Sequence, residues 1–446
     1  MHAAAITLIA LLMFCWGLFS ARLSRADLSA PIVFTAVGVL LSEGVDAVEP
    51  DLSHEIVKVL AELTLVLVLF ADAARVGLRD LRAEMGLYAR LLGIGLPLTV
   101  TVGALLAVVL FHGMGFWLAL VVGAALAPTD AALGAAVMTD PAVPGRVRRL
   151  LNVESGLNDG IATPIVSVAV VGAALEGTQG ASLGGALVDL AIGLAVGLAA
   201  GLVGGRAMRL ARRREWAAED LAGPAVLALS LVAYAGTLVL GGNGFVAAFV
   251  GGLMFGNFGG RSGVQEIFYV EQSAGLVSLL TWLLFGAVAV PILWDEAEWQ
   301  VAVYAVLSLT LIRMLPVWLA LVGSGLDRAT VAFIGWFGPR GLASIIFALI
   351  ALEDLHGAAD RAIAVIGTTV LLSVLAHGFS AKPLAARYGA SYGGTAEQAV
   401  GDRPHGDDLP VRGLLQRHGA VNDTTAGVRM IHDERLPRIS PDGSID

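Results

Sequence analysis

The sequence predicts an all-α polytopic membrane protein with about 13 transmembrane helices. Hydrophobic residues make up 57% of the 446-residue chain and charged residues only 15%, whereas a soluble domain usually carries about 25% charged residues. The chain also contains 55 glycines, which suit helices packed closely in lipid, where small residues let backbones approach. These observations exclude most classes of soluble protein.

Thirteen stretches of the sequence reach or approach the roughly 20 mostly apolar residues that a helix needs to cross the hydrocarbon core. In chain order they lie near residues 3–20, 28–43, 55–73, 87–111, 115–138, 147–172, 182–205, 219–240, 243–258, 266–292, 298–322, 328–352 and 360–383. The second and the ninth are the shortest.

The charges between these stretches alternate in sign along the chain. The even-numbered gaps are acidic and contain Glu43, Asp46, Glu49, Asp51, Glu176, Asp295, Glu296 and Glu298. The odd-numbered gaps and their edges are basic and contain Arg22, Arg25, Arg75, Arg79, Arg82, Arg146, Arg148, Arg149, Arg206, Arg209, Arg212, Arg213, Arg214, Arg261 and Arg328. Because basic loops face the cytoplasm, we expect a multi-pass protein of the cell inner membrane with its N-terminus outside and its C-terminus in the cytoplasm.

The composition changes near the C-terminal end of the chain. From Ser391 to Asp446 the sequence is rich in Gly, Asp, Arg and Pro and has no sustained apolar periodicity. We therefore expect a transmembrane domain over residues 1–385 and a cytoplasmic tail over residues 386–446 that is largely disordered.

Ionisable residues inside the apolar stretches mark candidate functional sites, because each costs roughly 2.5–3.5 kcal/mol on insertion scales. Five lie well inside the stretches: Asp130, Glu154, Asp159, Arg313 and Arg340. Three further acids lie at less certain depth: Glu62, Asp72 and Asp189.

The sixth stretch carries three oxygen-bearing side chains on one helical face. Ser155, Asn158 and Asp159 stand at positions i, i+3 and i+4, and a hydroxyl, an amide and a carboxylate together suit a hard cation. Glu154 is about 140° round the helix from Asp159 and points elsewhere. The alternative for Asp159 is an ion pair with an arginine, and a fixed ion pair is the favoured interpretation of Glu154.

Proline interrupts both the fifth and the twelfth stretch, in Ala127–Asp130 and in Phe337–Leu342. Proline removes a backbone donor and disfavours helix at the preceding residue, and unwound backbone at membrane depth is tolerated only where it is buried or lines a cavity. The first break would expose the carbonyl of Thr129 to an ion and place Asp130 at the N-terminus of a second half-helix, where the helix dipole stabilises its charge. The alternative is a simple proline kink capped by Asp130.

The two interrupted stretches are seven apart in order, so stretches 1–6 and 8–13 can form two repeats with the seventh as a linker. An odd offset inverts the second repeat, and paired broken helices in inverted repeats mark transporter binding sites. We therefore expect two inverted six-helix repeats whose broken helices cross at the midplane. The halves share no sequence similarity, so this expectation depends on geometry alone.

Charge balance at the midplane points to ion exchange. Three acids, Asp130, Glu154 and Asp159, accompany two arginines. If Arg313 and Arg340 offset Glu154 and one further acid, a single negative charge remains. One uncompensated buried carboxylate must hold a proton or a metal cation, and it cannot hold both.

Three motifs resemble those of sodium–proton exchangers of the monovalent cation:proton antiporter superfamily: Glu154-Ser155-x-x-Asn158-Asp159, Thr129-Asp130 on a broken stretch, and Gly338-x-Arg340-Gly341. The resemblance covers residues 1–385 and is nearer to the branch with an Asn-Asp pair, which includes bacterial and archaeal antiporters and the eukaryotic sodium–hydrogen exchangers. One departure is Ala131 after Asp130, where many members have proline.

This resemblance implies a role for each motif residue. Asp159 would alternately bind a proton and Na⁺ or K⁺. The groups that would complete or order the ion site are Asn158, Ser155, the Thr129 carbonyl, Asp130 and Asp72. Glu154 would form a structural ion pair with Arg313, and Arg340 would stabilise the crossing of the broken helices. The resemblance also implies electroneutral one-for-one exchange by an elevator-like motion in a homodimer.

Three other classes stay open from the sequence: a sodium-coupled symporter of an organic solute, a cation channel and an intramembrane enzyme. Channels usually show rings of residues from several subunits or a filter loop, and the sequence offers no convincing catalytic set. His377, near the end of the last stretch, is interpreted as a packing residue. We expect no enzyme activity, no cofactor and no nucleic-acid partner. The expected partners are lipid, a second copy of the chain, protons, and Na⁺ with K⁺ or Li⁺ as alternatives.

Overall fold

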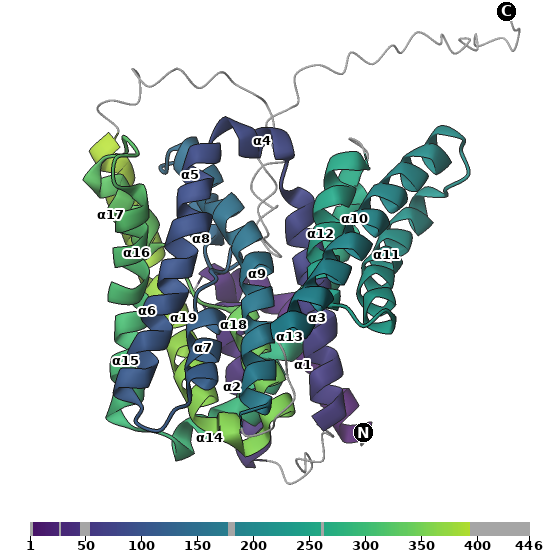
Figure 1. The fold of residues 1–446 in the computed structure, drawn as a ribbon. Coiled ribbons are helices and arrows are strands. Elements are labelled where there is room, and N and C mark those ends of the chain that lie inside the picture. Colours follow the sequence, from purple (N-terminus) through teal and green to yellow (C-terminus); the bar gives the residue numbers. More distant parts are fainter. Residues whose placement is uncertain (1–2, 26–27, 45–53, 177–182, 260–262, 393–446) are drawn as a thin grey trace, which may run out of the picture. The chain divides into compact units, whose positions relative to one another are not determined.

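The fold is helical throughout the part of the chain that the structure describes, and it contains no strand there (Figure 1). The computed structural model describes residues 3–25, 28–44, 54–176, 183–259 and 263–392. The predicted all-α class is confirmed. The predicted tail beyond Tyr392 lies outside the described residues.

The first half of the chain forms helices at each of the predicted stretches. In chain order the elements are α1 (Ala3–Arg25), α2 (Ala30–Gly44), α3 (His54–Arg75), α4 (Leu78–Ala83), α5 (Met85–Arg90), the π-helical turn η1 (Leu91–Gly95), α6 (Leu96–Leu110), α7 (Phe116–Ala125), α8 (Ala135–Met138), α9 (Gly145–Ala174) and α10 (Leu183–Arg213). The fourth stretch is built from α5, η1 and α6. The wider turn η1 ends two residues before Pro97, which cannot donate a backbone hydrogen bond.

The second half also follows the predicted stretches, with shorter pieces where proline or a bend interrupts a helix. Its elements are α11 (Glu219–Val239), α12 (Gly244–Phe258), α13 (Gly263–Leu284), the π-helical turn η2 (Phe285–Ala289), α14 (Val290–Asp295), α15 (Trp299–Leu309), α16 (Leu311–Leu321), α17 (Arg328–Trp336), α18 (Leu342–Leu355), the 3₁₀ turn η3 (His356–Ala359) and α19 (Asp360–Tyr392).

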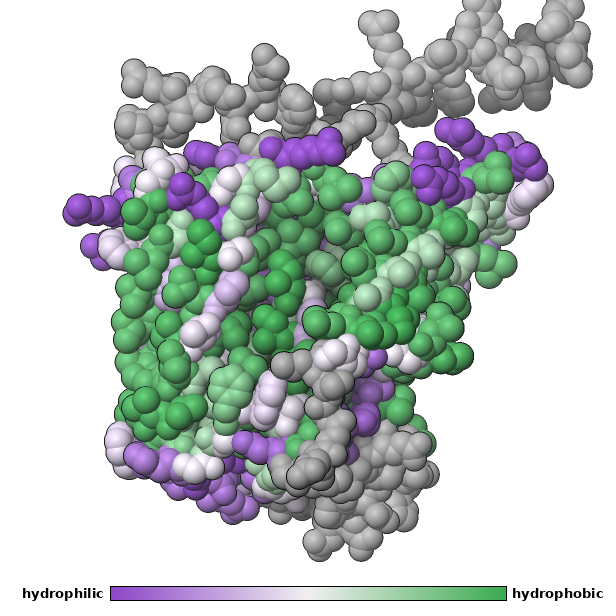
Figure 2. Space-filling model, viewed as in Figure 1, coloured by the Kyte–Doolittle hydropathy of each residue, from purple (hydrophilic) through white to green (hydrophobic). Residues whose placement is uncertain are grey.

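Length and composition identify the molecule as a multi-pass membrane protein. Eight helices or runs of consecutive helices among the described residues are long and apolar enough to cross a membrane. Helices α2, α7 and α12 contain apolar segments that are shorter than these eight. Figure 2 shows an apolar band between two hydrophilic ends on the face that it draws. The exact count of thirteen crossings stays a prediction.

Helix α10 ends later than the sequence predicted, at Arg213 instead of near residue 205. Arg212 forms an ion pair with Glu266 of α13, and the guanidinium of Arg206 lies 5.3 Å from the ring centre of Phe258 on α12. Arginine stems can lie along apolar surface while their charged heads reach polar groups. Arginines that we expected in or at the edge of a loop therefore extend the helix.

Helix α19 also continues beyond its predicted end, through residue 383 and past the domain boundary at residue 385, to Tyr392. The ring of Tyr388 stacks on Phe333 of α17 at 4.1 Å between centroids, and its hydroxyl lies 2.7 Å from the Thr330 hydroxyl. These contacts bury the last turns of α19 against α17 and explain why the helix does not end where the apolar stretch does.

Fourteen of the described helices fall into two groups by their contacts. One group contains α2, α3, α10, α11, α12 and α13, and the other contains α6, α7, α9, α15, α16, α17, α18 and α19. Within the first group, Gly252 and Gly256 of α12 lie against the backbone of Phe70 and Ala74 on α3, where any larger side chain would overlap it. The groups meet where α3 packs against α9 and α18, where α12 packs against α9 and where α13 packs against α18.

Candidate functional site

The two unwound segments, after α7 and after α17, contact each other directly. The amide of Asp130 donates to the carbonyl of Pro339 at 2.8 Å, and the amide of Leu342, the first residue of α18, donates to Asp130 Oδ2 at 2.9 Å. Leu342 and Asp130 are 212 residues apart in the sequence. The broken helices therefore cross, as expected from their corresponding positions in the two halves of the chain.

Arg340 donates hydrogen bonds to backbone carbonyls that the first break leaves without helical partners. Its side chain is fully buried, and its Nη1 donates to the carbonyl oxygens of Ala127 at 2.5 Å and Pro128 at 3.0 Å. Carbonyls at a helix end lack intrahelical partners, and buried ones need another donor. The arginine of the second break thus supplies donors to the end of α7.

Asp130 is held by backbone amides on both breaks. Its Oδ1 accepts from the amides of Ala132 at 2.7 Å and Leu133 at 3.3 Å, while its Oδ2 accepts from Leu342 of α18. The expected second half-helix is only the four-residue α8, which begins at Ala135 after a turn. The carboxylate therefore caps that turn and the start of α18, an arrangement that favours ordering of the site over direct ion binding.

Two glycines of the second break leave room for charged side chains. A Cβ at Gly341 would overlap the carboxylate of Asp130, and a Cβ at Gly338 would overlap the guanidinium of Arg313. Both positions therefore require glycine, because any larger residue would displace a charged group from the crossing.

Glu154 and Arg313 form a buried ion pair between α9 and α16. Arg313 Nη2 lies 2.7 Å from Glu154 Oε1, and both side chains are 3% exposed. This is the pairing that the resemblance to sodium–proton exchangers implied. Since both side chains are almost completely buried, loss of one would leave the other charge buried without compensation.

A cluster of neutral polar groups links the first break to α9. Asn158 Nδ2 donates to Thr129 Oγ1 at 2.7 Å, and the Ser155 hydroxyl lies 2.9 Å from the same oxygen. All three side chains are buried. Among the described residues, nothing donates a hydrogen bond to the buried Asn158 Oδ1. Asp159 follows directly on α9; its side chain is buried too, and its main-chain carbonyl accepts from Thr163 at 2.6 Å.

The three acids of uncertain depth lie in different surroundings. Asp72 of α3 is buried, and its carbonyl would lie 3.6 Å from a Cβ placed on Gly156 of α9. Helix α3 thus brings Asp72 beside the turn of α9 that carries Ser155. Glu62, on the same helix, is half-buried, and Asp189 of α10 is exposed.

Two side chains contribute to this region without having been predicted from the sequence. Ser373 of α19 accepts a hydrogen bond from the amide of Arg340 at 2.7 Å, and the ring of Phe249 on α12 fills the space beside Gly160, next to Asp159. The i, i+4 spacing of Ser373 and His377 was a usable signal, because it puts both on one face of a helix. Nothing in the sequence distinguishes Phe249 from other apolar residues.

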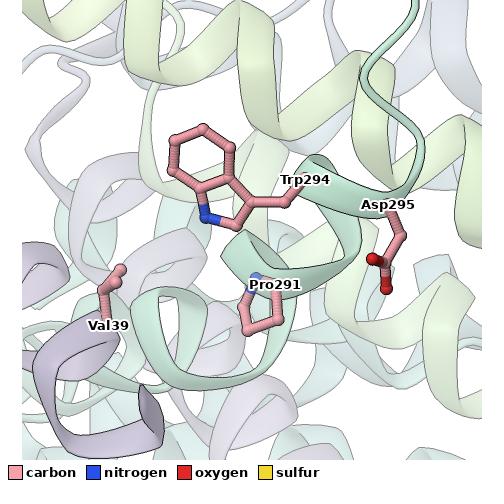
Figure 3. Close-up of a pocket in the computed structure, with 4 residues that line it drawn as sticks. All are labelled: Val39, Pro291, Trp294 and Asp295. Carbon is pink, nitrogen blue, oxygen red and sulfur yellow. The ribbon is translucent and has the colours of Figure 1, made fainter. Parts of the chain in front are cut away.

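A surface pocket lies apart from the polar cluster. Figure 3 shows Val39 of α2 and Pro291, Trp294 and Asp295 of α14 lining it. It offers one carboxylate and an indole, and none of the buried residues of the crossing lines it. This pocket is therefore not the candidate ion site.

Crossed broken helices, a buried ion pair and an oxygen-rich cluster beside a buried carboxylate define a multi-pass membrane protein whose polar centre suits a cation. The family model of the sodium/hydrogen exchanger transmembrane region matches residues 7–387. The chain belongs to that family, and the predicted superfamily is confirmed. None of the three other classes that the sequence left open finds support in this match.

Two relatives are transporters by name. The Na⁺/H⁺ antiporter ApNhaP of Aphanothece halophytica is 29% identical over 378 residues, which are 80% of this chain and 70% of that protein. The K⁺/H⁺ antiporter NhaP of Alkalimonas amylolytica is 27% identical over 380 residues, 82% of this chain and 64% of that protein. The chain thus spans about two thirds of the length of these relatives.

The fold matches a solved antiporter structure. The sodium proton antiporter MjNhaP1 from Methanocaldococcus jannaschii superposes with a TM-score of 0.69 over 84% of this chain and 98% of that one, at 22% sequence identity. At this level of identity the similarity establishes the fold.

Proposed function

We propose that this chain is a secondary antiporter that exchanges a monovalent cation for a proton by alternating access. Na⁺ is the first candidate, and K⁺ or Li⁺ are the alternatives, since the relatives include both Na⁺/H⁺ and K⁺/H⁺ antiporters by name. We further propose that transport needs no cofactor and involves no enzymatic step.

The observation that supports this function best is the oxygen cluster beside Asp159. The amide nitrogen of Asn158 is engaged by Thr129, so its buried oxygen is the group left for a ligand. A buried acceptor without a partner costs about 1–3 kcal/mol, and a hard cation would supply the missing partner. The hydroxyls of Thr129 and Ser155 would add neutral oxygen ligands, and Asp159 would add one negative charge.

Asp159 would then alternate between a cation and a proton. Both ions neutralise one carboxylate, so each displaces the other and the loaded site has the same net charge in either form. Three other buried charges near the crossing are held by protein groups: Arg313 pairs with Glu154, and Arg340 binds carbonyls of the first break. Asn158 stands where a second carboxylate would be needed to hold both ions at once. One cation would therefore exchange for one proton, without net charge movement.

Alternating access would arise from movement between the two groups of helices. The group that contains α9 and α18 carries both breaks and all ligands except Asp72, and it meets the other group mainly on α3 and α12. Asp72 on α3 would contribute to cation entry. We propose that the chain works as a homodimer in lipid, with the α3 group held still while the α9 group moves.

We propose that the protein lies in the inner membrane with its N-terminus outside and its C-terminus in the cytoplasm. Support comes from the ends of the helices. The C-terminal end of α10 and the N-terminal end of α17 lie opposite to α14 (Figure 1). Helix α10 ends at Arg213, α17 begins at Arg328, and α14 ends at Asp295. Basic ends face the cytoplasm.

The test of this function replaces Asp159 by Asn, which removes the charge and keeps the shape. Proton movement driven by Na⁺, K⁺ and Li⁺ in turn, measured in everted vesicles, should be abolished while the protein stays folded and abundant. Asp189→Asn is the matched control, because the same chemical change at an exposed carboxylate of α10 should leave exchange intact. Near-normal exchange by Asp159→Asn would contradict the assignment of Asp159.

A further inference from the structure

Two side chains of α19, Ser373 and His377, provide partners for the second break. They lie one helical turn apart on the same face of α19, and both are buried. The Ser373 hydroxyl accepts from the amide of Arg340 at 2.7 Å. His377 Nε2 lies 2.8 Å from the carbonyl of Trp336, the last residue of α17. The amide and the carbonyl are groups that an unwound segment leaves without helical partners.

The His377 ring links α19 to the end of α17. A carbonyl can only accept, so Nε2 donates to the carbonyl of Trp336. His377 Nδ1 lies 2.9 Å from the carbonyl of Ser373 and 3.1 Å from the Ser373 hydroxyl. The carbonyl of Trp336 also accepts from the amide of Gly338 at 2.8 Å. Helix α19 therefore holds the segment between Trp336 and Arg340 at both of its ends.

These contacts continue into the ion site through the side chain of Arg340. Its Nη1 binds the carbonyls of Ala127 and Pro128, the two residues before Thr129. The Thr129 hydroxyl in turn contacts Ser155 and Asn158. A displacement of the Arg340 backbone would thus move the carbonyls next to Thr129 and change how Thr129 meets α9.

We propose that Ser373 and His377 are positioning residues for the ion site. They hold the second break in place and, through Arg340, also hold the first break in place, so that Thr129 lies where it can bind the ion. This proposal rests on the proposed exchange function for the meaning of the site. The geometric part stands on the contacts alone, so it can be tested separately.

The geometric test measures hydrogen–deuterium exchange of the purified protein by mass spectrometry. In Ser373→Ala, deuterium uptake should rise in residues 337–341 and also in residues 126–134, which Arg340 links to the second break through Ala127 and Pro128. Ser373→Thr, which keeps the hydroxyl, should restore the wild-type pattern. Thr369→Val is the matched control, because Thr369 is buried one turn earlier on α19 and donates within its own helix, to Val365 at 2.7 Å. A rise confined to residues 337–341, or an equal rise in Thr369→Val, would overturn the proposal.

The functional test measures the apparent KM for Na⁺ and the maximal rate in proteoliposomes. Ser373→Ala and His377→Leu should raise KM about two- to tenfold, the range expected for loss of one hydrogen bond. Ser373→Thr and His377→Gln, which keep the donors and acceptors, should return KM to near the wild-type value. An unchanged KM in Ser373→Ala and His377→Leu would overturn the role. If the wild-type protein moves no protons, the proposed exchange fails, and the deuterium comparison still decides the positioning role.

Discussion

Charged side chains at the helix crossing and at the polar rim make similar pairs in different surroundings. At the crossing, Arg313 and Glu154 are 3% exposed and lie 2.7 Å apart. At the rim, which we define as Arg361, Glu296 and Glu298, the side chains are between 31% and 42% exposed and the pairs are 3.2–3.3 Å long. Water can replace a lost partner at the rim but not at the crossing. Burial, rather than the geometry of the pair, therefore decides which charged residues the fold requires.

The largest effect should come from separating the buried pair. Glu154→Ala and Arg313→Ala should each lower the free energy of unfolding by about 3–5 kcal/mol, because each leaves one buried charge uncompensated. The double variant should recover part of this loss, since it removes both charges together. Thermal unfolding in detergent measures all three. Strictly additive losses would mean that the two residues do not act as a pair.

A smaller loss of stability should follow from Asp130→Asn. One carboxylate oxygen becomes a donor and faces backbone amides of Ala132, Leu133 or Leu342, which donate to it in the wild type. Leaving buried groups unsatisfied costs about 1–3 kcal/mol, so thermal stability and exchange should fall together. Asp189→Asn, measured alongside, should change neither. If Asp130→Asn kept its stability and lost only cation affinity, Asp130 would be a direct ion ligand instead of an ordering residue.

The smallest effect belongs to the rim. Arg361→Gln should change the free energy of unfolding by only about 0.2–1 kcal/mol, because exposed pairs gain little over hydration. The difference from wild type should shrink further in high concentrations of choline chloride, which screens charge without supplying a transported alkali cation. A loss as large as that of Arg313→Ala would contradict the distinction between rim and crossing.

Local chemistry made much of the crossing predictable from sequence. Pro128 and Pro339 interrupt apolar stretches, so the breaks follow from a missing donor. Helical spacing put Ser155, Asn158 and Asp159 on one face, and the structure brings the first two to a common contact on Thr129.

The partners of each side chain across the crossing depend on packing between distant segments, so they were harder to predict from the sequence. The sequence indicated that Arg340 supports the crossing but not that its acceptors are carbonyls. It suggested Asp130 as the start of a half-helix, whereas the carboxylate caps a turn and the start of α18. The contribution of Ser373 arises only because α19 lies beside the second break. Helix ends were missed for a related reason, since side-chain pairing extends α10 to Arg213 beyond its apolar stretch.

The central claim is that one carboxylate, Asp159, binds either the cation or the proton. Its most direct test is the apparent KM for Na⁺ as a function of pH, measured in proteoliposomes with purified protein. Competition for one site predicts that KM rises as the proton concentration rises, while the maximal rate at saturating Na⁺ falls on both sides of an optimum because each ion must leave for the other to bind. A maximal rate that depends on pH with a KM that does not would mean that two groups titrate independently, and the single-carboxylate account would be wrong.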